Sequence, residues 1–171
     1  MASLNATAAS MLGFLHFGDL SGYELVQVAD MVIGAFWSLT RSQVYRELAA
    51  LADAGLIEAG DVGARSRRPY HLTAAGRDAF AAWVSEPPGD EQIRYPLLLR
   101  LSLGSLLGKD RILDVVAEQR GVHEARLAAY RAKQGTLGDP FLEATLAFGL
   151  HYEQAVLEWM DEVPGIIADT R

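Results

Sequence analysis

Two short segments in the first half of the chain concentrate arginine side chains. They are residues 41–46, with the sequence RSQVYR, and residues 65–68, with the sequence RSRR. A guanidinium presents several N–H donors in a planar fork, which suits it to phosphate oxygens and to the acceptor edges of nucleic-acid bases. Serine, glutamine and tyrosine add further hydrogen-bonding groups. The chemistry that these segments offer is therefore recognition by charge and hydrogen bonds.

Catalytic and metal-binding patterns are missing from the sequence. It contains no Gly-x-Ser-x-Gly, phosphate-loop or dinucleotide-binding motif, and it has no cysteine for a nucleophile, a disulfide or a thiolate ligand. The histidines are dispersed and lack the spacing of helical metal ligands; they are His16, His71, His123 and His151. We therefore expect a protein that is not an enzyme and that uses no metal or cofactor.

The charge of the chain is unevenly distributed. Residues 1–85 carry 6 Arg and 8 Asp+Glu, a net of -2, and residues 86–171 carry 9 Lys+Arg and 14 Asp+Glu, a net of -5, which together give the total of -7. An acidic total argues against a protein that coats nucleic acid without specificity. No apolar run reaches the roughly 18 uncharged residues of a membrane span, and no secretory signal is evident. These observations predict a cytoplasmic protein without a membrane partner.

Three helices are predicted before residue 55. The first covers about residues 4–17, and the second begins after Ser21 as its N-cap and ends near Gly34. Thr40 and Gln43 have the spacing of a capping box, which places the start of the third helix there.

The third helix has one apolar stripe and one polar face. Val44, Leu48 and Leu51 recur at helical spacing and should face the core, with Gly55 ending the helix. At about 100° per residue the opposite direction belongs to Ser42, Arg46 and Ala49, with Tyr45 beside them. The arginine-bearing face of this helix is therefore expected to be exposed.

A hairpin and a fourth helix follow. Short strands are predicted at residues 56–58 and 70–72, separated by a segment rich in turn formers that carries Arg65, Arg67 and Arg68. Thr73 should cap a helix that runs through Phe80 and Trp83, and the EPPGD segment at residues 86–90 breaks the pattern. This break suggests a domain boundary.

The second half is predicted to be entirely helical. Helices are expected at about residues 95–107, which is apolar on most sides and should pack between other helices, at 110–133, and at 140–162. The last of them carries a stripe suited to packing against another helix, at Phe141, Phe148, Tyr152, Val156 and Trp159 or Met160. Aromatic side chains could line a small-molecule cavity between subunits instead; they are Trp83, Tyr95, Phe141, Phe148, Tyr152 and Trp159. We favour packing in a dimer over such a cavity.

The predicted fold class is mainly α. The expected order is a winged helix-turn-helix, made of three helices and a two-stranded wing, at residues 1–86, and a helical dimerisation domain at residues 91–171. In a winged helix a helix N-terminus enters the major groove of DNA, and the hairpin reaches the backbone or the adjacent minor groove. In this fold both arginine-bearing segments would lie on the surface that contacts DNA.

Several motifs resemble those of the PadR family of bacterial regulators, over residues 11 to about 85. They are GYEL at residues 22–25, FW at 36–37, SQVYREL at 42–48, GLI at 55–57 and LTAAGR at 72–77. The helical remainder resembles, less specifically, the dimerisation region of longer members. The resemblance implies a homodimeric regulator, usually a repressor, which binds double-stranded operator DNA with an inverted repeat and is often released by a small-molecule effector.

The resemblance also implies which residues contact DNA. The recognition helix would use Ser42, Gln43, Tyr45 and Arg46, with Arg41 at its first turn, and the wing would use Arg67 and Arg68, with Arg65 at its tip. Many relatives carry proline directly after the recognition-helix tyrosine, where this chain has Arg46. Base preference therefore cannot be transferred from them.

Other interpretations fit some of the same residues. The wing arginines would also suit an ordinary solvated loop. The acidic total charge would suit a winged helix that has become a protein-interaction or small-molecule-binding module, although such a module has no need for arginines in both places. Tyr23, Phe36 and Trp37 are expected to be core or packing residues.

Overall fold

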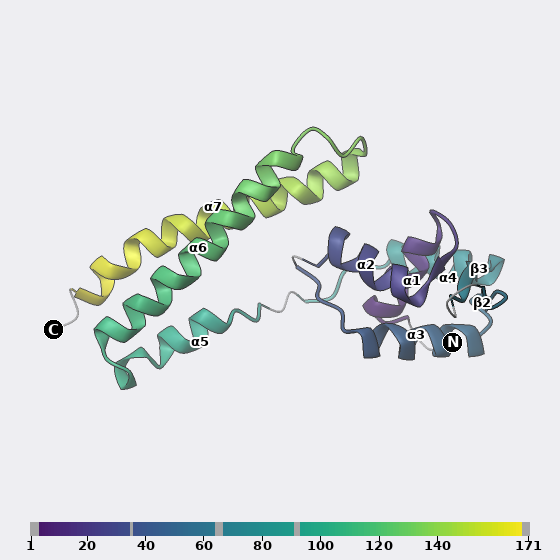
Figure 1. The fold of residues 1–171 in the computed structure, drawn as a ribbon, viewed down its shortest axis with the longest axis horizontal. Coiled ribbons are helices and arrows are strands. Elements are labelled where there is room, and N and C mark those ends of the chain that lie inside the picture. The colour runs from purple at the N-terminus through teal and green to yellow at the C-terminus, as the bar shows by residue number, and fades with distance from the viewer. Residues whose placement is uncertain (1–3, 35, 64–66, 91–92, 169–171) are drawn as a thin grey trace. The chain divides into compact units, whose positions relative to one another are not determined.

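The computed structural model describes residues 4–34, 36–63, 67–90 and 93–168 (Figure 1). The chain divides into two compact units, Met1–Asp90 and Glu91–Arg171. None of the helices formed by the described residues is long and apolar enough to cross a membrane.

Three helices build the core of the first unit, and each begins at a side chain that caps it. They are α1 (Ala6–Leu15), α2 (Gly22–Val32) and α3 (Arg41–Asp53). The predicted N-caps Ser21 and Thr40 are confirmed, and the Thr40–Gln43 capping box is present. The first helix is shorter than the predicted 4–17, because the Asn5 side chain accepts a hydrogen bond from Ala8 N and so fixes its start.

The wing belongs to a three-stranded antiparallel sheet. Its strands are β1 (Leu20–Ser21), β2 (Ile57–Ala59) and β3 (Pro69–Leu72), with β3 in the middle. Leu72 pairs with Ile57 on one side, and Tyr70 pairs with Leu20 on the other. The predicted hairpin is therefore confirmed. The strand β1 was not predicted, because two residues are too few to show an alternating pattern of apolar and polar side chains. Its pairing with β3 attaches the wing directly to the residue that caps α2.

The fourth helix, α4 (Ala74–Ser85), closes the first unit. Its predicted cap Thr73 accepts a hydrogen bond from Gly76 N, and its hydroxyl donates to Leu56 O at 2.9 Å. A Cβ at Gly76 would lie 2.1 Å from Leu56 O, so only glycine allows this helix to approach the strand so closely. The core of the unit is formed by buried side chains that include Met11, Leu12, Leu25, Val44, Leu48, Leu51 and Ile57.

The interpretation of Tyr23, Phe36 and Trp37 as core residues is wrong for the single chain. Their side chains are 53%, 55% and 44% exposed. The inward face of α2 is occupied by Leu25 and Ala29 instead, which turns Tyr23 outward.

The second unit begins with a short helix and not with the long one that was predicted. The observed elements are α5 (Pro96–Ser102), the 3₁₀ turn η2 (Gly104–Leu106), α6 (Lys109–Lys133) and α7 (Pro140–Ala168). Only Leu97 of α5 is buried. Leu101 is partly buried against the same core, whereas Leu98 and Leu99 are exposed, so helices of the single chain do not enclose this segment as the expected packing between helices requires.

Helices α6 and α7 form an antiparallel hairpin (Figure 1). The last helix runs six residues beyond the predicted end at residue 162, and Pro164 lies inside it. Val115, Val116, Val156 and Met160 form part of the apolar core between the helices, against which Trp159 packs.

A buried polar network crosses this hairpin. His123 Nδ1 bonds to Glu153 Oε2, and Arg126 Nη1 donates to Glu153 Oε1 at 3.0 Å. The Tyr95 hydroxyl lies 2.8 Å from His123 Nε2, and burial raises the pKa of Tyr95 to about 12. Tyr95 is the N-cap residue of α5, so the network ties the start of the second unit to both long helices.

Replacing Gly76 with alanine should destabilise the first unit by about 2 kcal/mol, because its Cβ would overlap the Leu56 carbonyl. The exposed neighbour Asp78→Ala should change stability by no more than about 0.5 kcal/mol. Urea unfolding followed by circular dichroism measures both. Equal midpoints for the two variants would contradict the close approach.

Replacing Glu153 with glutamine should destabilise the second unit by about 3 kcal/mol, because it removes the buried negative charge that pairs with His123 and Arg126. The exposed Glu162→Gln on the same helix is the matched control and should unfold like the unaltered protein. A Glu153→Gln midpoint equal to that of the control would show that the network adds no stability.

Candidate nucleic-acid interface

The outward face of α3 is polar and exposed, as its sequence predicts. Val44, Leu48 and Leu51 are buried. Ser42, Tyr45, Arg46 and Ala49 are exposed, and the Arg46 side chain is 70% exposed. The packing of one stripe therefore fixes which side chains the helix presents to a partner.

The first turn of α3 is held by its cap and by its neighbour α2. Gln43 Oε1 accepts hydrogen bonds from the backbone N and the hydroxyl of Thr40, both at 2.9 Å. The Gln43 carbonyl is thus committed to the cap, and only its amide NH₂ is left for a partner. The Arg41 guanidinium lies 5.9 Å from the centre of the Tyr23 ring, a cation–π contact that orients it.

Tyr45 is packed against a neighbouring helix, whereas Arg46 is only weakly held. The Tyr45 ring lies so close to Gly22 that a Cβ there would approach it to 2.6 Å, which places this ring against the start of α2. Arg46 is 3.4 Å from Glu47 Oε1, a long contact between side chains of which one is largely exposed. Such a pair contributes little, so Arg46 is free to exchange it for another acceptor.

Arg67 has a partner that the sequence did not indicate. Its Nη2 lies 2.8 Å from Glu24 Oε1 and 3.0 Å from Glu24 Oε2, and its Nε donates to Oε2 at 3.2 Å. The same carboxylate closes the capping box of α2, because it accepts from the backbone N and the hydroxyl of Ser21. These hydrogen bonds, those from Ser21 first, hold the pKa of Glu24 below its usual range.

Arg68 and Arg65 differ from Arg67. Arg68 is exposed, and no carboxylate in the described ranges pairs with it. The predicted contact Arg65 lies outside the described residues.

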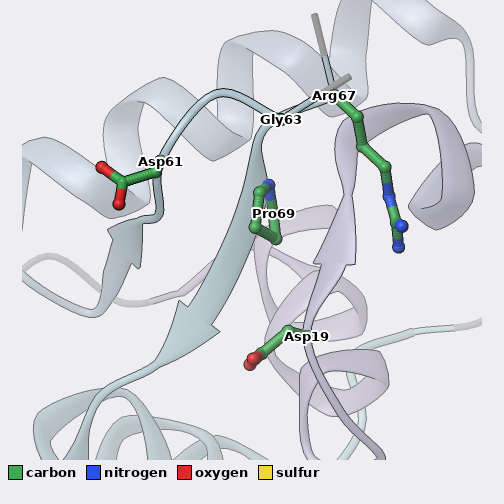
Figure 2. Close-up of a pocket in the computed structure, with 5 residues that line it drawn as sticks. All are labelled: Asp19, Asp61, Gly63, Arg67 and Pro69. Carbon is green, nitrogen blue, oxygen red and sulfur yellow. The ribbon is translucent and has the colours of Figure 1, made fainter. Parts of the chain in front are cut away.

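A shallow pocket lies at the base of the wing. It is lined by Asp19, Asp61, Gly63, Arg67 and Pro69, and Figure 2 shows Pro69 between Asp61 and Arg67. Asp19 Oδ2 is 2.7 Å from His71 Nδ1 on β3. Two carboxylates at the rim would repel an anion, so we assign no ligand to this pocket.

The six aromatic side chains considered for a small-molecule cavity belong to both units. Trp83 is in the first unit, stacked on Phe80. Tyr95 and Trp159 contact each other within the core of the second unit. Phe141, Phe148 and Tyr152 are exposed along α7, the last two as a stacked pair.

Comparison with known proteins identifies both units. Residues 11–82 match the PadR-like family of transcriptional regulators, and residues 93–167 match the region named virulence activator alpha C-term. The negative transcriptional regulator PadR of Bacillus subtilis is 26% identical, over 92% of this chain and 95% of its own.

Solved structures share the fold over nearly the whole chain. The B. subtilis PadR structure with operator DNA has a TM-score of 0.79, 23% identity and coverage of 95% of this chain and 98% of its own. The PadR-like regulator BC1756 of Bacillus cereus has a TM-score of 0.82, 23% identity and coverage of 96% and 99%. B. subtilis PadR is also known in complex with p-coumaric acid, at a TM-score of 0.74 and 24% identity over 96% of this chain and all of its own. The predicted winged-helix fold with a helical C-terminal region is confirmed.

These relatives are transcriptional regulators and not enzymes. The family model covers the unit that holds the exposed face of α3 and the wing, and the second model covers the helical unit. The chain is therefore similar to the PadR-like transcriptional regulators over residues 11–82, and to the virulence activator alpha C-term region over residues 93–167.

Proposed function

We propose that this regulator is a homodimeric repressor that binds an inverted-repeat operator in double-stranded DNA. The observation that carries the proposal is the exposed polar face of α3, which a buried apolar stripe holds in a fixed direction. The structure of B. subtilis PadR with operator DNA supports the same use of the fold. The protein would act in the cytoplasm, where its operator lies.

The two arginine-bearing elements would have separate roles. Ser42, Tyr45 and Arg46 would reach base edges in the major groove, with the Gln43 amide and Arg41 at the helix start. The wing residues Arg65, Arg67 and Arg68 would lie along the phosphate backbone or the minor groove, with Arg67 paired to Glu24. Base contacts set sequence preference, whereas backbone contacts add affinity for any sequence.

The second unit would join two copies. Leucines of α5 and η2 are exposed in the single chain, as are aromatic side chains of α7; they include Leu99, Leu106, Phe141 and Phe148. A soluble chain seldom leaves so many large apolar side chains in water, and a second copy can cover them. A dimer would place two recognition helices in successive major grooves, about 34 Å apart.

A small-molecule effector would release the operator. The complex of B. subtilis PadR with p-coumaric acid supports a small aromatic acid as the type of ligand. The exposed stacked pair Phe148 and Tyr152 on α7 is an aromatic surface that such a ligand could use.

Arg46→Ala should lower the ratio of the affinity for the upstream DNA of the protein's own gene to the affinity for a shuffled duplex by about 10-fold. The reason is that a bidentate base contact is worth about 1–3 kcal/mol. Arg68→Ala should weaken binding to both duplexes by the same factor and lower the salt dependence. Fluorescence anisotropy at two salt concentrations measures these effects. Equal weak binding of the unaltered protein to both duplexes would favour the protein-interaction or small-molecule module instead.

Static light scattering at micromolar concentration should give a mass near twice the 18.6 kDa of one chain. Leu106→Glu or Phe148→Glu should shift the protein toward the monomer, because each puts a charge on an apolar face. Val62→Glu, at an exposed apolar position of the wing, is the matched control. An 18.6 kDa mass for the unaltered protein would contradict the dimer.

A further inference from the structure

We propose that Glu24 is a built-in counter-charge that withholds Arg67 from DNA and so limits the affinity of the wing for the phosphate backbone. The inference rests on the proposed DNA binding, and it assigns to Glu24 a role that the contact residues named above do not include. Glu24 is a positioning residue here, because it would act on DNA through Arg67.

In the protein without DNA, the Arg67 guanidinium is bonded to the Glu24 carboxylate. Both carboxylate oxygens lie within 3.0 Å of Arg67 Nη2, and Nε bonds to Oε2 as well. This is the forked arrangement in which a guanidinium binds a phosphate, so the carboxylate occupies the donors that a DNA phosphate would use.

The carboxylate cannot easily move away when DNA arrives. Its Oε2 accepts from Ser21 N at 2.9 Å and from the Ser21 hydroxyl at 2.7 Å, which fixes it to the first turn of α2. Ser21 itself is held in β1 opposite Pro69 of β3, two residues beyond Arg67. Glu24 therefore lies in the first turn of the helix that follows β1, and Arg67 lies two residues before β3, the strand that pairs with β1.

The pair has no net charge, which decides what it contributes to DNA binding. If Arg67 turned to a phosphate, Glu24 would be left as an uncompensated anion beside the DNA backbone. Neutralised arginine releases no counterion from DNA, whereas a free arginine releases about 0.9 per phosphate contact. Arg68, which no carboxylate in the described part of the chain neutralises, would act at full charge.

The chain itself provides the variant that separates charge from capping. In α3 the third position of the capping box is Gln43, and its Oε1 accepts both hydrogen bonds from Thr40. Glu24→Gln should therefore keep the cap of α2 while removing the charge that holds Arg67.

The experiment measures binding to a shuffled duplex by fluorescence anisotropy from 0.05 to about 0.3 M salt. For each wing that binds, Glu24→Gln should raise the association constant for DNA about fivefold at about 0.15 M salt. It should also steepen the slope of log K against log salt concentration by about 0.9 per wing. Arg67→Ala in the unaltered background should have little effect, unlike Arg68→Ala.

A double-mutant cycle shows whether Glu24 acts through Arg67. The gain from Glu24→Gln should vanish when Arg67 is alanine. Asp61→Asn is the matched control, since Asp61 is an exposed wing carboxylate that lines the same pocket and is not bonded to Arg67. Any effect it has should be the same with Arg67 present or absent.

Three results would overturn the inference. They are unchanged binding by Glu24→Gln, a gain that survives in the Arg67→Ala background, or a loss of affinity, which would make the pair a support for a DNA-binding wing. Circular dichroism and thermal unfolding of each variant exclude a folding defect as the cause. The proposed operator binding fails on a different result, namely no preference of the unaltered protein for its upstream DNA, because the counter-charge is measured on shuffled DNA.

Discussion

The arrangement of the first unit depends on the burial of one stripe of α3. Val44, Leu48 and Leu51 pack into the core formed with α1 and α2, and removing side chains of this size from water stabilises the fold by roughly 1.5–3 kcal/mol each. A helix that is held by one face can present only the opposite face to a partner. The exposed positions of Arg46 and Tyr45 are thus a consequence of core packing, and the caps at Thr40 and Ser21 determine where the presented face begins.

The electrostatics of this protein are local. The chain carries a net charge of -7, yet two short segments of the first unit hold five of the six arginines of that unit. The structure adds that these arginines are not equivalent. Arg41 is stacked on Tyr23, Arg46 has one long contact, Arg67 is neutralised by Glu24, and Arg68 is unpaired among the described residues. The affinity for a polyanion therefore depends on which arginines are already paired with a carboxylate. An estimate of that affinity from the number of arginines alone would be too high.

Polar contacts also determine how the second unit is joined internally. Glu153 receives a hydrogen bond from Arg126 and bonds to His123, which in turn contacts Tyr95 at the start of α5. Each polar group in this series forms a hydrogen bond with the next one. For this reason the Glu153 carboxylate, which is only 2% exposed, is tolerated inside a helical hairpin. Leu97 of α5 belongs to the core of this unit, whereas Leu98 and Leu99 of the same helix are exposed to solvent.

The sequence by itself determined the features that arise from local interactions. Caps, turn-forming residues and helical periodicity depend on neighbours a few positions away, so the starts of α2, α3 and α4, the wing hairpin and the outward face of α3 could be predicted from residues such as Ser21, Thr40 and Thr73. Only the tertiary structure decided what depends on contacts between distant segments: the strand β1, the exposure of Tyr23 and Trp37, the break after α5, the Glu153 network and the pairing of Arg67 with Glu24. Arg67 and Glu24 are 43 positions apart, and no periodicity connects them. Arg67 and Glu24 meet because β1 lies beside β3. A strand of two residues such as β1 leaves no pattern in the sequence from which this strand pairing could be predicted.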